Sequence, residues 1–139
     1  MKVKKWMTPE PFLLAEDQPI KVAILQQLES RIRHMPVVRD NVLVGIVTDR
    51  DLKRALPSVI AGATPEEYRA FMERTTVSEI MTHDPFTCEP ETDLVEAVRI
   101  FVERKFGAIP VVENGRVVAI LTQTDVMRAF LSFLEPGEG

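Results

Sequence analysis

The sequence predicts an α+β protein made of two β-α-β-β-α repeats packed by pseudo-two-fold symmetry. Three observations predict it. The chain repeats itself at a spacing of 74 residues, each copy alternates short β-branched runs with longer amphipathic stretches, and neither copy is long enough to bury a core alone. At 139 residues, two copies packed together are long enough for one cooperative fold.

The repeat is direct and ungapped. Residues 3–56 align with residues 77–130, and 16 of the 54 aligned pairs are identical. The identities cluster at apolar and turn positions, as in the Pro-Val-Val runs that begin at Pro36 and Pro110. We divide the chain into repeat 1 (3–56), a helical insertion (57–76), repeat 2 (77–134) and a tail that we expect to be disordered (135–139).

The same elements are expected in each repeat. A short apolar strand comes first, and an amphipathic helix follows it, with Asp17 and Thr92 as candidate N-caps. Two β-branched runs then flank a tight turn, at Asp40-Asn41 or Asn114-Gly115, which predicts a hairpin. A second helix closes the repeat. The expected first strands lie at 12–14 and 86–88, the first helices at 19–31 and 93–105, and the second helices at 49–56 and 123–134.

The insertion carries its own helix signal. The run Thr64-Pro65-Glu66-Glu67 combines a capping box with proline at the first helical position, which predicts a helix that ends near Arg74. Tyr68, Phe71 and Met72 give this helix one apolar side. We expect it at the rim of the fold or at a contact with a second copy of the chain.

The composition argues against several classes of protein. A net charge of −4 disfavours binding to duplex nucleic acid, so we expect no nucleic-acid partner. The apolar runs are far shorter than the roughly 18 residues that span a bilayer, so we expect no membrane partner. The single cysteine, Cys88, excludes an intrachain disulfide and favours a reducing, cytoplasmic location. His34 and His83 lack partners at ligand spacing, so we expect no metal and no cofactor.

The informative polar residues form the repeated pairs Thr48-x-x-Asp51 and Thr122-x-x-Asp125, where a strand is expected to end and a helix to begin. Read structurally, each pair is a capping box that contributes about 1 kcal/mol. Read as a binding site, the start of a helix favours an anionic group, and an aspartate one turn later can accept two hydrogen bonds from a ribose diol. Spacing alone favours capping and leaves the ribose site open.

A second feature is the uneven positive charge of the repeats. Arg33-His34 precedes a strand of repeat 1, where repeat 2 has Gly107-Ala108. These residues could be a solvated helix end, where cations favour the helix dipole. Alternatively, they could form a phosphate clamp together with Arg50 and Lys53, because the arginine guanidinium offers a planar fork of donors.

These residues resemble the CBS domain, which is named after cystathionine β-synthase. The resemblance rests on Met-Thr at the start of each repeat, Pro-Val-Val before each turn, and the run from Gly45 to Asp51. Two such domains in tandem resemble a CBS pair, or Bateman module, over residues 3–134. Residues 33–38 and 45–52, with the insertion after them, are similar to the CBS portion of acetoin-utilisation B-type proteins. Repeat 2 departs slightly from the pattern, with Ala119 in place of Gly45.

The resemblance implies that an adenine nucleotide or adenosyl ligand (AMP, ADP, ATP or S-adenosylmethionine) binds in clefts between the two repeats. It assigns the ribose diol to Asp51 and Asp125, and ribose or phosphate contacts to Thr48 and Thr122. Phosphates would meet Arg33 and His34, so repeat 2, which lacks them, would have the weaker phosphate site. The base would lie against strand residues, namely Phe12, Leu13, Leu14, Met35, Pro36, Phe86, Thr87, Cys88, Ile109 and Pro110.

The resulting hypothesis is a non-catalytic sensor that forms a homodimer and regulates a protein that the sequence does not identify. The alternative is an interaction or dimerisation module with vestigial pockets. The sequence carries no Gly-rich phosphate loop or nucleophile elbow, and it is too short for a catalytic (β/α)₈ barrel, so we expect no enzyme activity. The ribose role requires that Asp51 and Asp125 can be reached from a cavity.

Overall fold

The α+β class is confirmed by a computed structural model, which describes residues 1–56 and 62–135. The tail predicted to be disordered, beyond Glu135, and the first residues of the insertion lie outside the described residues. The helices are η1 (Val3–Lys5, 3-10), α1 (Ile20–Ser30), α2 (Asp49–Ala55), α3 (Pro65–Arg74), α4 (Val77–Ile80), α5 (Leu94–Arg104) and α6 (Gln123–Leu134). The strands are β1 (Thr8–Pro9), β2 (Leu14–Ala15), β3 (His34–Arg39), β4 (Val42–Thr48), β5 (Thr82–His83), β6 (Ala108–Glu113) and β7 (Arg116–Thr122).

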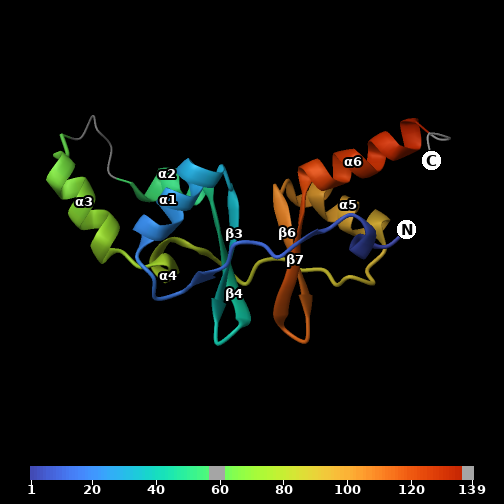
Figure 1. Ribbon diagram of the computed structural model, residues 1–139, viewed down its shortest axis with the longest axis horizontal. Coiled ribbons are helices and arrows are strands. Elements are labelled where there is room, and N and C mark those ends of the chain that lie inside the picture. Colours follow the sequence, from blue (N-terminus) through green and yellow to red (C-terminus); the bar gives the residue numbers. More distant parts are fainter. Residues whose placement is uncertain (57–61, 136–139) are drawn as a thin grey trace. The chain divides into compact units, whose positions relative to one another are not determined.

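The chain folds as two compact units that do not follow the linear order of the repeats. The first unit is Phe12–Pro85, and the second unit combines Met1–Pro11 with Phe86–Gly139. The first residues of each repeat therefore belong to the unit that holds the hairpin of the other repeat. Figure 1 shows both hairpins, β3–β4 and β6–β7, each with its helices beside the end opposite the turn.

In the first unit, β4 lies between two partners. It pairs antiparallel with β3 and, on its other edge, with β5, where Gly45 lies opposite His83 and Ile46 opposite Thr82. The short strand β2 adds to β3 in parallel. The core beneath this sheet contains the fully buried side chains of Leu14, Met35, Val37 and Val47.

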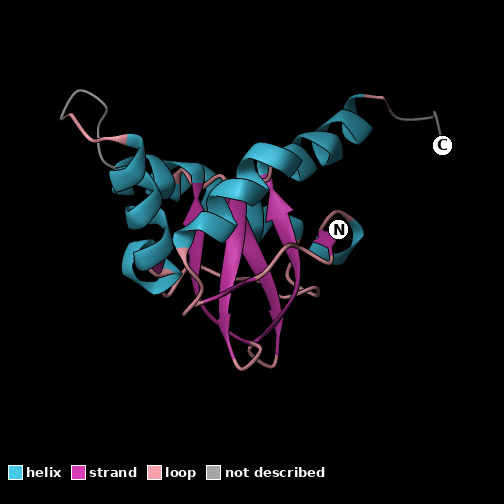
Figure 2. Cartoon of the chain, turned by 60° about the vertical axis from the view of Figure 1, so that its left-hand side comes forward, coloured by secondary structure: helices cyan, strands magenta, loops and turns pink. Residues whose placement is uncertain are grey.

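The second unit repeats this plan. Here β7 lies between β6 and β1, and Thr8 lies opposite Ile120. The chain at Cys88 adds to β6 in parallel through a bridge to Val111, so the predicted strand 86–88 is reduced to one bridging residue. Val3, from the N-terminal segment, is fully buried in this core beside residues of repeat 2. Figure 2 shows the strands in magenta, with the hairpin turns at their lower ends.

The predicted hairpin turns are confirmed. Asp40 and Asn41 both have positive φ (49° and 68°), as do Asn114 and Gly115 (53° and 80°). Two consecutive left-handed residues give a two-residue turn whose twist matches that of the strands. The Asn and Asp side chains tolerate this conformation better than most others do.

The helix boundaries agree with prediction, but two predicted caps are wrong. The N-cap positions of α1 and α5 are Pro19 and Asp93, and neither makes a side-chain capping hydrogen bond. Asp17 lies outside the helix, and Thr92 instead accepts a hydrogen bond from Glu89 N–H at 2.9 Å.

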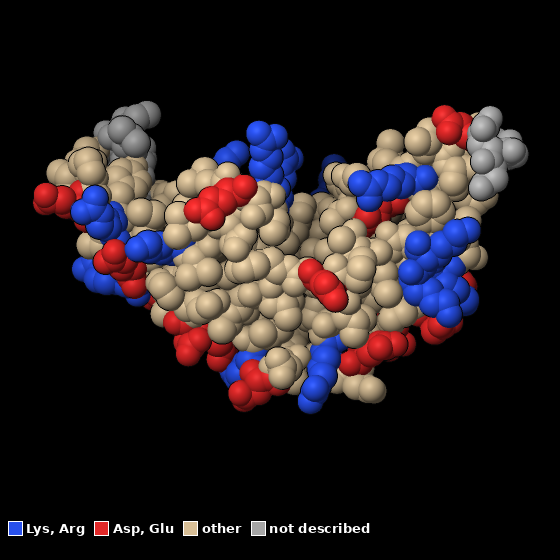
Figure 3. Space-filling view, in the orientation of Figure 1, with Lys and Arg blue, Asp and Glu red and all other residues tan. Residues whose placement is uncertain are grey.

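The insertion helix α3 is confirmed, and it begins with the predicted capping box between Thr64 and Glu67. Lys21 Nζ of α1 lies 3.7 Å from Glu73 Oε1 of α3. Acidic and basic side chains are interleaved over α3, at the left of Figure 3. Within residues 1–56 and 62–135, no helix is long and apolar enough to cross a bilayer.

Candidate functional site

The corner between β4 and α2 is a capping box. The Thr48 hydroxyl accepts a hydrogen bond from Asp51 N–H (3.2 Å), and Asp51 Oδ2 accepts one from Thr48 N–H (3.0 Å). Strand β4 ends here because the Thr48 side chain caps the exposed amides of the next helix. The structural reading of this pair is therefore confirmed.

The corner between β7 and α6 has the same geometry. The Thr122 hydroxyl accepts from Asp125 N–H at 3.2 Å, and Asp125 Oδ2 accepts from Thr122 N–H at 2.9 Å. Arg128 Nη1 lies 3.5 Å from Asp125 Oδ1, as Arg54 Nη2 lies 3.7 Å from Asp51 Oδ1. The repeat thus preserves a polar cluster of threonine, aspartate and arginine.

Each cluster holds a further threonine that sequence reasoning missed. The Thr8 hydroxyl donates to the Asp125 carboxylate, with oxygen distances of 3.0 and 3.1 Å. The Thr82 hydroxyl reaches the Asp51 carboxylate at 3.4 Å to each oxygen. Both threonines come from the short outer strands β1 and β5, and the repeated Met-Thr pair was the sequence signal that could have pointed to them.

The two carboxylates are well covered. Asp51 is 7% exposed and Asp125 is 2% exposed, and each accepts hydrogen bonds from backbone and side-chain donors. A ribose could therefore bond to either carboxylate only if the neighbouring threonine hydroxyl gave way. The ribose role of these residues stays a prediction, with this added requirement.

The structure brings Arg33 and His34 to the Thr48 corner. His34 lies opposite Thr48 in the β3–β4 register, and the Arg33 carbonyl accepts from Asp49 N–H at 3.0 Å. Arg33 is exposed and His34 is half-buried. Burial lowers the pKa of His34, which the nearby Asp49 carboxylate partly opposes and the Arg33 charge reinforces. The Thr48 corner therefore has a permanent positive charge, on Arg33, beside the His34 imidazole, whose neutral form is favoured by burial.

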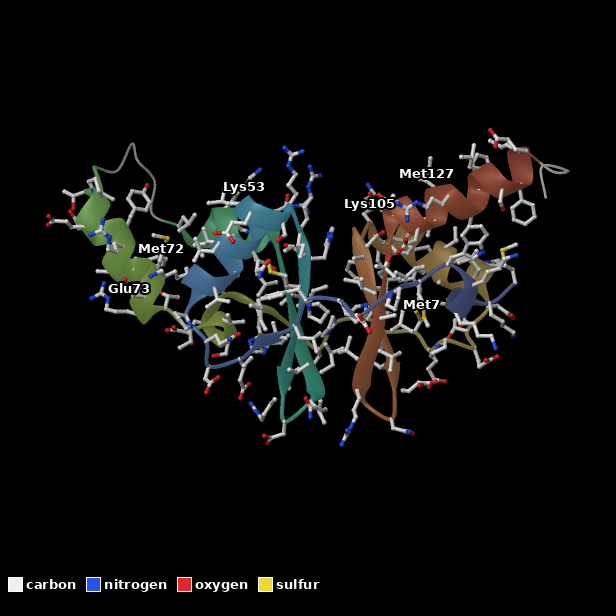
Figure 4. The ribbon with its side chains drawn as sticks, in the orientation of Figure 1. Met7, Lys53, Met72, Glu73, Lys105 and Met127 are labelled. Carbon is white, nitrogen blue, oxygen red and sulfur yellow. The ribbon has the colours of Figure 1, made fainter. Side chains whose placement is uncertain are left out.

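Arg50 and Lys53, the other predicted phosphate ligands, are exposed on α2. Figure 4 shows Lys53 pointing away from the strands of its unit. In the second unit, Ala108 lies opposite Thr122, and the Gly107 carbonyl accepts from Gln123 N–H at 3.1 Å. The backbone of the corner is thus preserved there, while the basic side chains of Arg33 and His34 have no counterpart at those positions.

The apolar residues predicted to meet the base differ in exposure. In the first unit, Leu14, Met35 and Pro36 are buried, whereas Phe12 and Leu13 are half-buried and retain some accessible surface. Leu14 lies beside Val37 on the neighbouring strand. The half-buried pair is therefore better placed to meet a ligand than the buried residues, which form the core.

In the second unit, Cys88, Ile109 and Pro110 are buried, and Phe86 and Thr87 are exposed. The Phe86 ring packs 5.6 Å from that of Phe106, and the Arg104 guanidinium lies 4.8 Å from its centre. Burial raises the pKa of Cys88 to about 11, so this thiol stays protonated near neutral pH and is a poor nucleophile. In the described part of the chain, no group of three or more His, Cys, Asp or Glu residues could hold a metal ion.

The comparison with known families matches both repeats of the sequence. The family model of the CBS domain matches residues 3–58 and again residues 77–132. The chain belongs to the CBS domain family. Its two matched segments make it a tandem CBS pair, in agreement with the two Thr-x-x-Asp corners.

Relatives of this CBS pair differ in length. A CBS domain-containing protein of Dictyostelium discoideum is 32% identical over 136 residues, which cover 96% of this chain and 94% of that protein. The A-adding tRNA nucleotidyltransferase of Aquifex aeolicus is 33% identical over 138 residues, but these cover only 15% of that enzyme. The segment similar to this chain is thus most of one protein and a small part of an enzyme.

Solved structures show the same fold. A Vibrio cholerae protein assigned to acetoin utilization (AcuB) is 29% identical, with a TM-score of 0.79 over 97% of this chain and 93% of that chain. CBSX2 of Arabidopsis thaliana, solved in complex with AMP, is 28% identical, with a TM-score of 0.79 over 96% and 98% of the two chains. The CBS domain pair of protein MJ0100, solved with 5′-methylthioadenosine and S-adenosyl-L-methionine, is 25% identical, with a TM-score of 0.76 over 94% and 99% of the two chains.

Proposed function

We propose that this CBS pair is a non-catalytic regulatory module that binds an adenine nucleotide or a related adenosyl compound. The observation that carries the proposal is the duplicated Thr-x-x-Asp corner in a chain that matches CBSX2, a CBS pair solved with AMP, over nearly its whole length. The relative solved with S-adenosyl-L-methionine supports the wider adenosyl class. In this role the module forms a homodimer and acts on a regulated protein.

Ribose recognition would replace one hydroxyl donor by another. Asp51 keeps its bond to Thr48 N–H, while a ribose hydroxyl takes the place of the Thr82 hydroxyl. Such an exchange costs little, because both donors are neutral hydroxyls bonded to the same charged acceptor. At 3.4 Å, the Thr82 contact is longer than an ordinary hydrogen bond between oxygens, so the site in the first unit is the easier one to open.

Phosphate recognition would belong to the first unit. Arg33 is exposed at the edge of the Thr48 corner, and its guanidinium can bind a phosphate through two parallel hydrogen bonds. Arg50 and Lys53 on α2 add positive charge next to this corner. The second unit has Gly107-Ala108 in the place of Arg33-His34. We therefore expect its site to favour the nucleoside part of a ligand over its phosphates.

A second candidate function is an interaction module without a ligand. The observation in its favour is that both aspartates already accept hydrogen bonds within the protein, as caps and from the hydroxyls of Thr8 and Thr82. In this case the duplicated pairs stabilise the helix starts and do nothing else. Ligand binding separates the two candidates directly.

Thermal unfolding in the presence of AMP, ATP or S-adenosylmethionine tests the proposal. A ligand at 100 times its dissociation constant stabilises the folded state by about 2.7 kcal/mol. For a chain of this size, we expect the melting temperature to rise by roughly 5 to 15 °C. If all three compounds leave the melting temperature unchanged at millimolar concentration, the adenosyl function is wrong and the interaction module is favoured.

A matched pair of variants tests the assigned residue. Asp51→Ala and Glu67→Ala each remove the carboxylate of a capping box, from α2 and α3 respectively. Without ligand, Glu67→Ala should cost about 1 kcal/mol of unfolding free energy, and Asp51→Ala should cost more, because Asp51 is buried and also accepts from the Thr82 hydroxyl. Only Asp51→Ala should also abolish the ligand-induced rise in melting temperature. A full rise in the Asp51→Ala protein would mean that the ligand binds elsewhere.

A further inference from the structure

Each of the two buried aspartates accepts a hydrogen bond from a threonine that is itself at the surface. Asp51 and Asp125 are buried, whereas Thr82 on β5 and Thr8 on β1 are exposed. The Thr82 hydroxyl donates to Asp51, and the Thr8 hydroxyl donates to Asp125. A hydroxyl at the surface can bond to water instead, so it can leave the carboxylate without becoming a buried group that lacks a partner. Both threonine hydroxyls can therefore be displaced.

The backbone donors to these carboxylates are fixed in place. The N–H groups of Thr48 and Thr122 belong to the capping boxes at the starts of α2 and α6. Loss of either bond would leave an amide at a helix start without its partner. Arg54 and Arg128 lie 3.7 and 3.5 Å from the carboxylates, which is too long for a strong hydrogen bond. The threonine hydroxyls of β1 and β5 are thus the donors that a ribose hydroxyl can replace.

The two threonine contacts differ in strength. The Thr8 hydroxyl lies 3.0 and 3.1 Å from the two carboxylate oxygens of Asp125, close to the ordinary range for a hydrogen bond between oxygens. The Thr82 hydroxyl lies 3.4 Å from both carboxylate oxygens of Asp51, which is beyond that range. The exposed fractions of the two aspartates, 2% for Asp125 and 7% for Asp51, follow the same order. Thr8 therefore holds its aspartate more firmly than Thr82 does.

In the first unit, the aspartate also has a hydroxyl donor that stays with it. The Thr48 hydroxyl donates to Asp51 Oδ2 at 3.1 Å, in addition to the Thr48 N–H at 3.0 Å. Asp51 therefore keeps two donors from Thr48 when the Thr82 hydroxyl turns away. A carboxylate has about four acceptor positions, so the remaining ones suit the two hydroxyls of a ribose diol. Because the charge of Asp51 stays partly satisfied, opening this corner costs less free energy.

We propose that the Thr82 and Thr8 hydroxyls compete with a ribose diol for the two aspartates, and that the firmer Thr8 contact keeps Asp125 closed. The natural chain then binds one adenosyl ligand, at Asp51. This inference rests on the adenosyl binding proposed above, and it names the residues that decide which aspartate accepts the ribose. Thr82 and Thr8 are positioning residues, because they act on the ligand through the carboxylate.

A purely structural role for these threonines predicts the opposite effect on ligand affinity. If the Thr82 hydroxyl only held the Asp51 carboxylate in position, its removal would leave the affinity unchanged or would lower it. If the hydroxyl competes with the ligand, its removal raises the affinity, because the apparent affinity is reduced by the fraction of molecules in which the site is closed. The change from threonine to valine separates the two roles, since valine is also β-branched but has no hydroxyl.

Calorimetric titration of the full chain with AMP, ATP and S-adenosylmethionine tests the competition. We expect Thr82→Val to bind at least one of them roughly threefold more tightly than the natural chain, or better. Thr82→Ser keeps the hydroxyl and should bind like the natural chain, whereas Thr8→Val should raise the stoichiometry from one ligand per chain to two. Thr64→Val, which removes a capping hydroxyl from the start of α3, controls for lost stability and should change neither value. Circular dichroism shows whether each variant is folded.

The outcomes separate this inference from the proposed function. If neither the natural chain nor any variant binds the three compounds, adenosyl binding is wrong and the competition falls with it. If the natural chain binds a ligand and the affinity of Thr82→Val is unchanged or lower, the competition alone is overturned. The stoichiometry of the natural chain needs no variant, and two ligands per chain would show that Thr8 does not keep Asp125 closed.

Discussion

His34 and Ala108 occupy the same place in the two repeats, opposite the capping threonine at the start of the following helix. Only the first of them can change its charge. His34 is half-buried, so its protonated form is less well solvated than it would be in water. This desolvation lowers the pKa of His34 below its ordinary value. A residue pair that differs in this way lets one corner respond to pH while its counterpart does not.

We predict that His34 makes the chain less stable at mildly acidic pH. Because the folded pKa of His34 is lowered, the unfolded chain takes up a proton at a higher pH than the folded chain does. The free energy of unfolding should therefore fall as the pH drops through about 6.5. In urea unfolding between pH 8 and pH 5, His34→Ala should show a smaller fall.

His83→Ala, which removes an exposed histidine on β5, is measured beside His34→Ala as a matched substitution. Identical pH profiles for His34→Ala and the natural chain would show that the lowered pKa has no effect on stability.

At the scale of elements, the close approach of β5 to β4 explains a difference between the repeats. A Cβ atom at Gly45 would lie 2.5 Å from Met81 Sδ and 2.9 Å from the Thr82 carbonyl oxygen. Ala119, at the same position of repeat 2, is fully buried opposite Pro9. The outer strand therefore sits closer to the hairpin in the first unit, which requires the absence of a side chain at residue 45.

We predict that Gly45→Ala destabilises the chain by roughly 1 to 3 kcal/mol, because the Met81 side chain and the Thr82 backbone must both move. Chemical denaturation measures this change directly. Met81→Ala removes two of the three clashing atoms, so the double variant should be less destabilised than the sum of the two single variants. Strictly additive effects would contradict the steric explanation.

At the scale of the whole molecule, the N-terminal segment belongs to the unit that holds repeat 2. Val3 is fully buried there, its N–H donates to the Thr92 carbonyl at 2.9 Å, and Lys2 and Lys4 pair with Asp93 and Glu91. The corresponding segment of repeat 2 packs against repeat 1 in the same manner. There the Val77 N–H donates to the Gln18 backbone carbonyl at 2.8 Å. The first segment of each repeat is thus a structural part of the unit that holds the hairpin of the other repeat.

We predict that deletion of residues 1–11 loosens the second unit selectively. Loss of the buried Val3 side chain alone should lower the free energy of unfolding by roughly 1.5 to 3 kcal/mol. Hydrogen exchange should become faster in residues 108–122 and change much less in residues 34–48. Lys2→Ala/Lys4→Ala removes only the exposed ion pairs and should have a small effect. Equal acceleration in both hairpins would contradict the assignment of the N-terminal segment to one unit.

Much of the local structure could be predicted from the sequence. The hairpin turns, the helix α3 and both Thr-x-x-Asp capping boxes depend on residues at most a few positions apart, and all were confirmed. The predicted caps Asp17 and Thr92 were wrong, because the chain enters α1 and α5 through Pro19 and Asp93. In the candidate site, the contacts of Thr8 and Thr82 could not be predicted, since they join residues 117 and 31 positions apart.

The sequence by itself determined the duplication, the order of elements in each repeat and the polar corner that both repeats carry, because these features depend on local spacing. Only the tertiary structure decided which segment borders which hairpin and how deeply the two aspartates are buried. These properties depend on contacts between distant parts of the chain, for which periodicity and capping rules hold no information.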